Sequence, residues 1–102
     1  MDMKQMMRQA QKMQAQLAQA QDEIKDMSAE ATAGGGMVKA VAMGDGSIAS
    51  IKLDKDAVDP EDIEMLEDMI VAAVNESLRA VAAQGNARLS SITGGMNIPG
   101  LM

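Results

Sequence analysis

The sequence lacks cysteine, histidine and all three aromatic residues. Without cysteine, the chain can form neither a disulfide framework nor a thiolate metal site, which fits a reducing compartment. Without histidine, cysteine and tyrosine, the commonest acid–base and nucleophilic groups of enzymes are missing. A catalytic site would have to use carboxylates, lysine, serine or threonine, so we expect a protein that is not an enzyme and has no cofactor and no small-molecule substrate.

The absence of aromatic side chains also limits the core. The 102 residues are 47% hydrophobic and 24% charged, which is ordinary for one small folded domain. Much of the apolar content comes from 12 methionines and many alanines, whose side chains give a thin and adaptable core. Small domains bury a low fraction of their surface, so we expect association with a second copy to supply the stability that disulfides and metals do not.

Long hydrophobic runs are absent as well. Glutamine interrupts residues 1–21 every few positions, so we expect no secretory signal peptide. The chain has no apolar segment of about 18 residues, the length that a membrane-spanning helix requires. We therefore expect no membrane partner and a cytoplasmic location.

Charges of both signs are present but unevenly distributed. The net charge of −6 argues against nucleic acid at first sight, because DNA-binding proteins usually carry a basic surface. Residues 1–21 nevertheless carry three cations and one acid, a net charge of +2, whereas residues 22–102 carry six cations and fourteen acids, a net charge of −8. This asymmetry indicates a basic N-terminal segment on an acidic body.

Near the N-terminus, apolar residues recur at alternating spacings of three and four with no proline or glycine between them, which predicts a long helix. The apolar seam contains Met3, Met6, Ala10, Met13, Leu17, Ala20, Ile24 and Met27. A helix of this length spans roughly 37 Å, more than a small domain needs for its own packing, so part of it is expected to project. Residues 32–36, which include three consecutive glycines, are expected to end the helix with a flexible break.

Alternating patterns predict a β-hairpin with strands at residues 37–43 and 48–53. The Asp45-Gly46 pair between them is typical of a two-residue type I′ turn. In the register that this turn sets, one face is entirely apolar and is expected to form the core. The pairs on this face are Val38 with Leu53, Ala40 with Ile51, and Ala42 with Ala49. Two strands alone are marginal and leave unpaired edges, so we expect a homodimer built partly through the sheet.

A second helix is predicted after the hairpin, with Asp59 as its N-cap and Pro60 at its first position. Apolar residues between 63 and 81 form a stripe wide enough to be covered on more than one side. Gly85 either ends this helix or only weakens it, because the apolar pattern could continue as far as Ile92.

Together these patterns predict an α+β fold with a long N-terminal helix, a small antiparallel sheet and a C-terminal helix. The last ten residues, TGGMNIPGLM, show no helical or strand period. We therefore expect a single domain at residues 1–92 and a flexible C-terminal tail at residues 93–102.

Three aspartates between the hairpin and the second helix resemble the start of a calcium-binding loop. An EF-hand requires glycine at the sixth position and glutamate at the twelfth, but a loop starting at Asp54 has Asp59 and Met65 there. The segment is better explained as a polar connection, and we expect no metal site.

The basic residues of the N-terminal segment, Lys4, Arg8 and Lys12, are four positions apart. On a helix this spacing drifts by about 40° and rises by about 6 Å per step, which gives a row that could follow successive phosphates. The cations lie near the positive end of the helix dipole, where helix stability alone would favour acids. The alternative interpretation is a solvated helix face. Neighbouring glutamines add neutral donors for phosphate or sugar oxygens: Gln5, Gln9, Gln11 and Gln16.

The methionine seam also has two interpretations. Methionine at heptad spacing usually packs inside its own protein, but it can also form an adaptable surface for partner helices. The second interpretation supports a rival function, an interaction module whose Met- and Gln-rich helix packs on a partner coiled coil through Met6, Met13 and Leu17.

Four segments of the chain resemble the YbaB/EbfC family of small bacterial nucleoid-associated proteins. They are MKQMMRQAQKMQAQL, MVKAV, EMLEDMIVAAVNESLR and ITGGMNIPGLM, in this order. The resemblance implies an intertwined α+β homodimer in the bacterial nucleoid, with the first helices projecting as two arms that hold double-stranded DNA with little sequence preference. It also implies DNA contacts at Lys4, Arg8 and Lys12 of the first helix and at Arg88 of the second, with Arg79 as a further position.

Overall fold

The long N-terminal helix predicted from the heptad pattern is present in the computed structural model, which describes residues 2–94. Helix α1 (Met3–Lys25) begins where the Asp2 carboxylate accepts a hydrogen bond from the backbone N–H of Gln5 (2.8 Å). The elements that follow are β1 (Ser28–Ala33), β2 (Val38–Met43), β3 (Ile48–Leu53), a single 3₁₀ turn η1 (Lys55–Ala57) and α2 (Ile63–Thr93).

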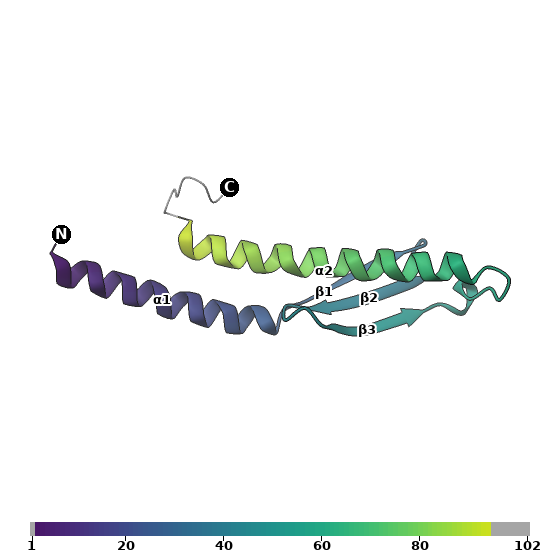
Figure 1. The fold of residues 1–102 in the computed structure, drawn as a ribbon, viewed down its shortest axis with the longest axis horizontal. Coiled ribbons are helices and arrows are strands. Elements are labelled where there is room, and N and C mark those ends of the chain that lie inside the picture. The colour runs from purple at the N-terminus through teal and green to yellow at the C-terminus, as the bar shows by residue number, and fades with distance from the viewer. Residues whose placement is uncertain (1, 95–102) are drawn as a thin grey trace.

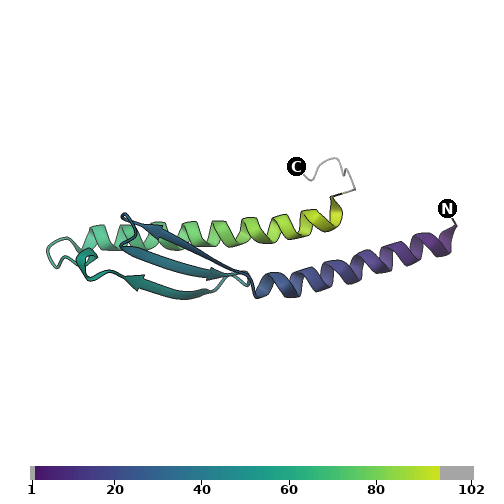
Figure 2. The ribbon, with the colours of Figure 1, turned by 180° about the vertical axis from the view of Figure 1, so that it is seen from behind.

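These elements form an elongated α+β molecule, which confirms the predicted fold class (Figure 1). The sheet and the N-terminal part of α2 form the body, and α1 continues beyond the sheet (Figures 1 and 2). The molecule measures 71 × 25 × 16 Å. No helix among residues 2–94 combines the length and the apolar character needed to span a bilayer.

Strand β1 corrects the expectation for the end of the first helix. We expected that helix to continue to a break at residues 32–36 and a two-stranded hairpin to follow. Instead, Ser28–Ala33 pairs along its whole length with β2, from Ser28 opposite Met43 to Ala33 opposite Val38. Its residues, SAEATA, have little strand propensity of their own, so pairing with β2 overrides the local preference.

The sheet has the order β1-β2-β3 with antiparallel pairing throughout. The three glycines of the expected break form the β1–β2 turn. Gly34, Gly35 and Gly36 all have positive φ (63°, 69° and 93°), a conformation that glycine adopts without steric cost.

The predicted β2–β3 register is confirmed from Val38, which pairs with Leu53, through Val41. It is wrong beyond that point, where Ala42 pairs with Ile48 and leaves Ala49 in a bulge. The turn between the strands is longer than predicted, because the N–H of Met43 donates to the carbonyl of Ser47 (2.8 Å) across three residues. Such loops consist of a type I turn followed by a positive-φ glycine, as at Gly46 (φ 89°), and they shift the register next to them.

The start of α2 also differs from the prediction, because its N-cap is Asp62 and not Asp59. The Asp62 carboxylate accepts from the N–H of Met65 (3.2 Å). Asp59 caps the preceding turn instead, since its carboxylate accepts from the N–H of Glu61 (2.9 Å) and its carbonyl from the N–H of Asp62 (3.0 Å). An Asp-Pro pair is equally suited to the first two positions of a β-turn, which is the role it has here.

Helix α2 passes through Gly85 without interruption and ends at Thr93. This outcome selects the second of the two interpretations of Gly85. Thr93 therefore belongs to the helix, and residues 95–102 of the expected tail lie outside the described residues. The domain boundary at residue 92 stays a prediction.

The core is as thin as the composition predicts. One cluster centres on Val38, Ala40, Ala57 and Ala73, and a second on Ala29, Ala42 and Val81. Helix α2 lies over β1 and β2 (Figures 1 and 2).

The β3 part of the predicted core face is not buried in one chain. Ile51 and Leu53 each remain 43% exposed, although Val38 and Ala40 opposite them are fully buried. The cause is that α2 does not extend over β3, so half of the apolar face has no cover within the chain.

Candidate nucleic-acid interface

The part of α1 that projects from the body carries the predicted basic row. We call residues 3–19 the arm, because none of them is buried, whereas Ala20 is fully buried. Only the C-terminal part of α1 therefore packs on the rest of the chain, and the arm is fixed at one end. A helix held in this way presents its side chains to solvent on nearly all sides.

Lys4, Arg8 and Lys12 are all exposed on this arm. No carboxylate of residues 2–94 forms an ion pair with any of them. The glutamines between them share the same surface, since Gln5 and Gln9 border one shallow recess together with Arg8 and Lys12. The structure thus brings three predicted site residues together as an unneutralised row.

Arg88 is placed differently, at the base of the arm. Its Nε donates to Oε2 of Glu23 in α1 (2.9 Å), and its Nη1 donates to Oγ of Ser91 (3.1 Å). The Arg88 and Glu23 side chains are 36% and 41% exposed, so the pair is partly open to water. The ion pair ties the end of α2 to α1 across 65 positions of sequence.

The recess beside Arg88 links it to the basic row. Gln16 is the next position of the four-residue repeat after Lys12, and it lines a recess together with Gln19, Arg88 and Ser91. One polar track therefore extends from Lys4 at the tip of the arm to Arg88. Sequence reasoning missed Gln19 and Ser91, because nothing in the local pattern shows that α2 ends beside α1.

Arg79 lies on the body, away from this track. Its guanidinium is bound to Glu76 one turn earlier in α2, with Nη2 2.8 Å and Nε 3.2 Å from Oε2. Both side chains are more than half exposed, so this is an ordinary surface pair.

Two glycines allow the base of the arm to pack closely on the body. A Cβ at Gly85 would lie 3.2 Å from Cγ2 of Ile24, and a Cβ at Gly44 would overlap the carbonyl oxygen of Ile24. The N–H of Gly44 donates to the carbonyl of Met27 (2.8 Å) just beyond the helix end. The arm is therefore held between α2 and the β2–β3 turn.

The aspartates that resemble a calcium loop are used as caps. Asp54 accepts from the N–H of Asp56 (2.9 Å), and Asp59 caps its own turn as described above. Among residues 2–94, no group of three acids is arranged to hold a metal ion.

Comparison with known proteins identifies the family. Residues 1–96 match the model of the YbaB/EbfC DNA-binding family. The chain belongs to this family. The match covers the arm, the sheet and α2.

Relatives in the YbaB/EbfC family are similar over nearly the whole chain. A nucleoid-associated protein of Pelotomaculum thermopropionicum is 47% identical over 98% of this chain and 95% of its own length. Another, from Thermoanaerobacter pseudethanolicus, is 49% identical over 94% of this chain and 86% of its own length. The crystal structure of an uncharacterized protein from Helicobacter pylori has the same fold, with a TM-score of 0.73 and 24% identity over 92% of this chain and 99% of that one.

Proposed function

We propose that this chain is a nucleoid-associated protein whose homodimer binds double-stranded DNA through the backbone phosphates, with little sequence preference. The arms of the two copies provide the contacts, and Lys4, Arg8 and Lys12 are the main DNA-binding residues. The observation that carries the proposal is the row of three exposed cations without an intramolecular acid, on a helix that projects from an otherwise acidic protein. Membership of a DNA-binding family and relatives named nucleoid-associated proteins support it.

Segregation of charge explains how a protein with a net charge of −6 can bind a polyanion. Residues 54–68 hold eight acids and one lysine, and they lie at the end of the molecule opposite the arm (Figure 1). The acids repel DNA from that end, so contact is restricted to the arms. Phosphate contacts carry no sequence information, which accounts for the low specificity.

The dimer rests on the uncovered apolar surface. Ile51 and Leu53 of β3 are both 43% exposed. Isolated apolar residues on a surface are ordinary, but half of a continuous core face left open is a reason for association. A second copy that covers β3 would complete the core and place two arms on one particle.

Arg88 has a secondary role in the proposed interface. Its guanidinium has five N–H donors, and the contacts with Glu23 and Ser91 use two of them. The remaining donors can contact a phosphate while the ion pair persists. Glu23 lowers the attraction of Arg88 for DNA, so we expect Arg88 to contribute less than the arm cations, and Arg79 to contribute nothing specific.

A salt titration of DNA binding tests the proposal. Six arm cations per dimer would give a slope of log affinity against log salt of roughly −5 if all of them meet phosphates. A random duplex is titrated with the wild type and with the triple variant Lys4→Gln, Arg8→Gln, Lys12→Gln in gel shifts at several salt concentrations. We expect the triple variant to lose the salt-sensitive binding and to stay folded and dimeric.

A matched control separates the arm from general charge. The triple variant Lys39→Gln, Lys52→Gln, Lys55→Gln removes the same charge from the body and should bind DNA nearly as well as the wild type. Equal loss of affinity in the two triple variants would contradict the arm as the binding site.

The rival function, docking on a partner coiled coil, has one observation in its favour. Met3 and Met6 are 79% and 57% exposed, so the apolar seam of the arm is open at its tip. Docking of a helix through Met6, Met13 and Leu17 would persist or strengthen in high salt, whereas phosphate binding weakens. The same titration therefore distinguishes the two functions.

A further inference from the structure

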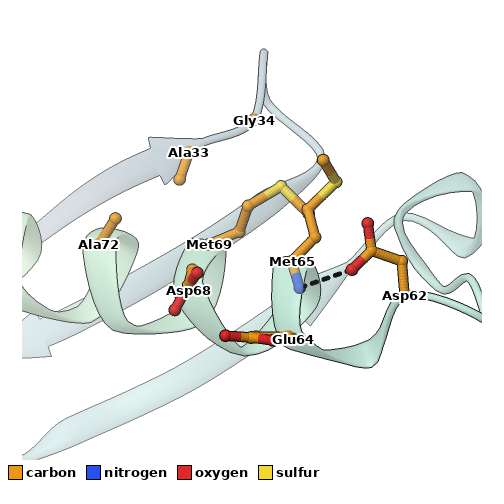
Figure 3. A pocket seen from close by; sticks show the side chains of 8 residues that line it. All are labelled: Ala33, Gly34, Asp62, Glu64, Met65, Asp68, Met69 and Ala72. Atoms are coloured by element: carbon orange, nitrogen blue, oxygen red, sulfur yellow. Dashed lines mark hydrogen bonds between the residues drawn. The ribbon is translucent and has the colours of Figure 1, made fainter.

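A groove at the acidic end of the molecule has no role in the proposed DNA contact. Its lining comes from the end of β1, the turn after it and the first three turns of α2 (Figure 3). We call it the methionine groove. The residues that line it are Ala33, Gly34, Asp62, Glu64, Met65, Asp68, Met69 and Ala72.

The chemistry of the methionine groove is apolar at its centre and acidic at its rim. Met65 and Met69 lie side by side and reach toward the Gly34 turn, and the carboxylates of Glu64 and Asp68 lie on the α2 side (Figure 3). Met65 is 58% exposed, although methionine is an apolar side chain. Flexible thioether side chains can adapt to an apolar partner, so the groove is suited to an apolar helix that also carries positive charge.

The tip of the arm has this chemistry. Met3, Met6 and Met7 lie on one face at helical spacing and are the exposed large apolar residues of α1. Lys4 and Arg8 flank that face and form no ion pair with the acids of residues 2–94. The methionines match the centre of the groove, and the two cations match its rim.

We infer that the methionine groove binds the arm tip of another copy of the chain, in a contact between dimers that is separate from the dimer interface. One chain cannot make the contact with itself, because its arm tip and its groove lie at opposite ends of a 71 Å molecule (Figure 1). A contact between two different surfaces is heterologous, so it repeats from dimer to dimer and forms open chains or rings.

The arm tip that enters the groove uses the same cations that contact phosphate. Self-association and DNA binding therefore compete for Lys4 and Arg8. This competition rests on the proposed function, whereas the self-association does not require it. Both contacts weaken with salt, because exposed charges are screened.

Sedimentation of the intact protein tests the self-association. At about 50 mM salt the wild type is expected to form species larger than a dimer as its concentration rises, and at high salt to return to the dimer. The double variant Glu64→Lys, Asp68→Lys should stay a dimer at low salt. The control variant Glu30→Lys, Glu76→Lys changes the net charge by the same amount outside the groove and should associate like the wild type.

Disulfide crosslinking tests whether the arm tip lies in the methionine groove. The chain has no native cysteine, so only the introduced cysteines can form a disulfide. A Met6→Cys protein mixed with a Met65→Cys protein should give a mixed disulfide at low salt, at least several-fold more than Met6→Cys mixed with Glu76→Cys. A wild type that remains a dimer at all concentrations, or equal crosslinking in the two mixtures, would overturn the inference.

Added duplex DNA distinguishes this inference from the proposed function. A random duplex should dissociate the wild-type species larger than a dimer. The groove variant, Glu64→Lys with Asp68→Lys, should bind DNA with an affinity within about twofold of the wild type. Loss of association in the groove variant, with no DNA binding by either protein, would refute the proposed function alone. DNA binding without any association would refute the inference alone.

Discussion

At the residue scale, the base of the arm depends on positions that have no side chain. Gly44 lies against the backbone of Ile24, and Gly85 lies against its side chain. A backbone carbonyl within a helix cannot move aside, whereas the methyl groups of isoleucine can shift by a few tenths of an ångström. The two glycines therefore differ in how strictly they are required.

Gly44→Ala is expected to destabilise the fold by about 1–3 kcal/mol, because its Cβ would overlap the Ile24 carbonyl oxygen and force α1 away from the turn. Urea denaturation measures the loss. Gly46→Ala is the control, since its Cβ meets open space and only the positive φ of 89° is strained, which should cost less, about 1 kcal/mol. A Gly44→Ala protein as stable as the wild type would contradict the packing described for the arm.

Glu23→Gln tests the restraint on Arg88. The change removes the carboxylate that occupies Nε, so DNA affinity should increase and the salt slope should steepen by about one unit for each further phosphate that an Arg88 side chain neutralises. The stability cost should stay below about 1 kcal/mol, because the pair is partly exposed. Gel shifts with Glu76→Gln, which frees Arg79 by the same change of charge, provide the control. Equal increases in affinity in both variants would show an effect of net charge alone.

At the scale of the element, α1 has a charge order that opposes its own dipole. Its first turn holds no acid beyond the Asp2 cap, and the basic row begins in that turn. Acids would stabilise the positive end of the dipole, so Lys4, the cation in the first turn, reduces helix stability by about a few tenths of a kcal/mol. The unfavourable position of this cation is explained if the exposed row serves the proposed DNA contact.

Lys4→Glu should therefore separate stability from binding. It places an acid in the first turn, so amide hydrogen exchange near the start of α1 should slow, while DNA affinity falls. Lys12→Glu, in the middle of the helix, should lower DNA affinity similarly without slowing exchange, because the dipole acts only near the helix ends. Faster exchange in the Lys4→Glu arm would contradict the electrostatic account of α1.

At the scale of the whole molecule, the open core face connects folding with assembly. Helix α2 covers two strands of the three, so the apolar face of β3 has no cover within the chain, and the proposed dimer would supply one. The two clusters of small buried residues offer little reserve stability for a chain without disulfides.

Ile51→Lys is expected to shift the proposed dimer to a monomer and to lower both its thermal stability and its DNA affinity, because the charge enters the apolar surface that we propose a second copy covers. Light scattering coupled to size exclusion measures the shift. Ser50→Lys adds the same charge on the opposite face of β3 and should leave the dimer intact. Dimers of equal stability in both variants would place the interface elsewhere.

Much of the fold could be predicted from local patterns. The heptad seam predicted α1, the alternating residues predicted β2 and β3 with part of their register, and the apolar stripe predicted α2. Strand β1 was missed although SAEATA alternates polar residues with alanine, because alanine and glutamate have little strand propensity and the conformation of this segment depends on β2. The bulge at Ala49 and the cap at Asp62 were missed because Asp-Gly and Asp-Pro pairs each suit more than one turn.

The basic row of the candidate site was predictable as well, because Lys4, Arg8 and Lys12 are separated by one helical repeat and their relation is local. The sequence by itself therefore determined the features that follow a local repeat. These are the two helices, the hairpin and the basic row of the arm. The tertiary structure alone decided that Arg88 meets Glu23, that β3 stays uncovered and that Met65 lies in an acidic groove. These features join residues distant in sequence, and such contacts depend on how the elements pack, which no local repeat encodes.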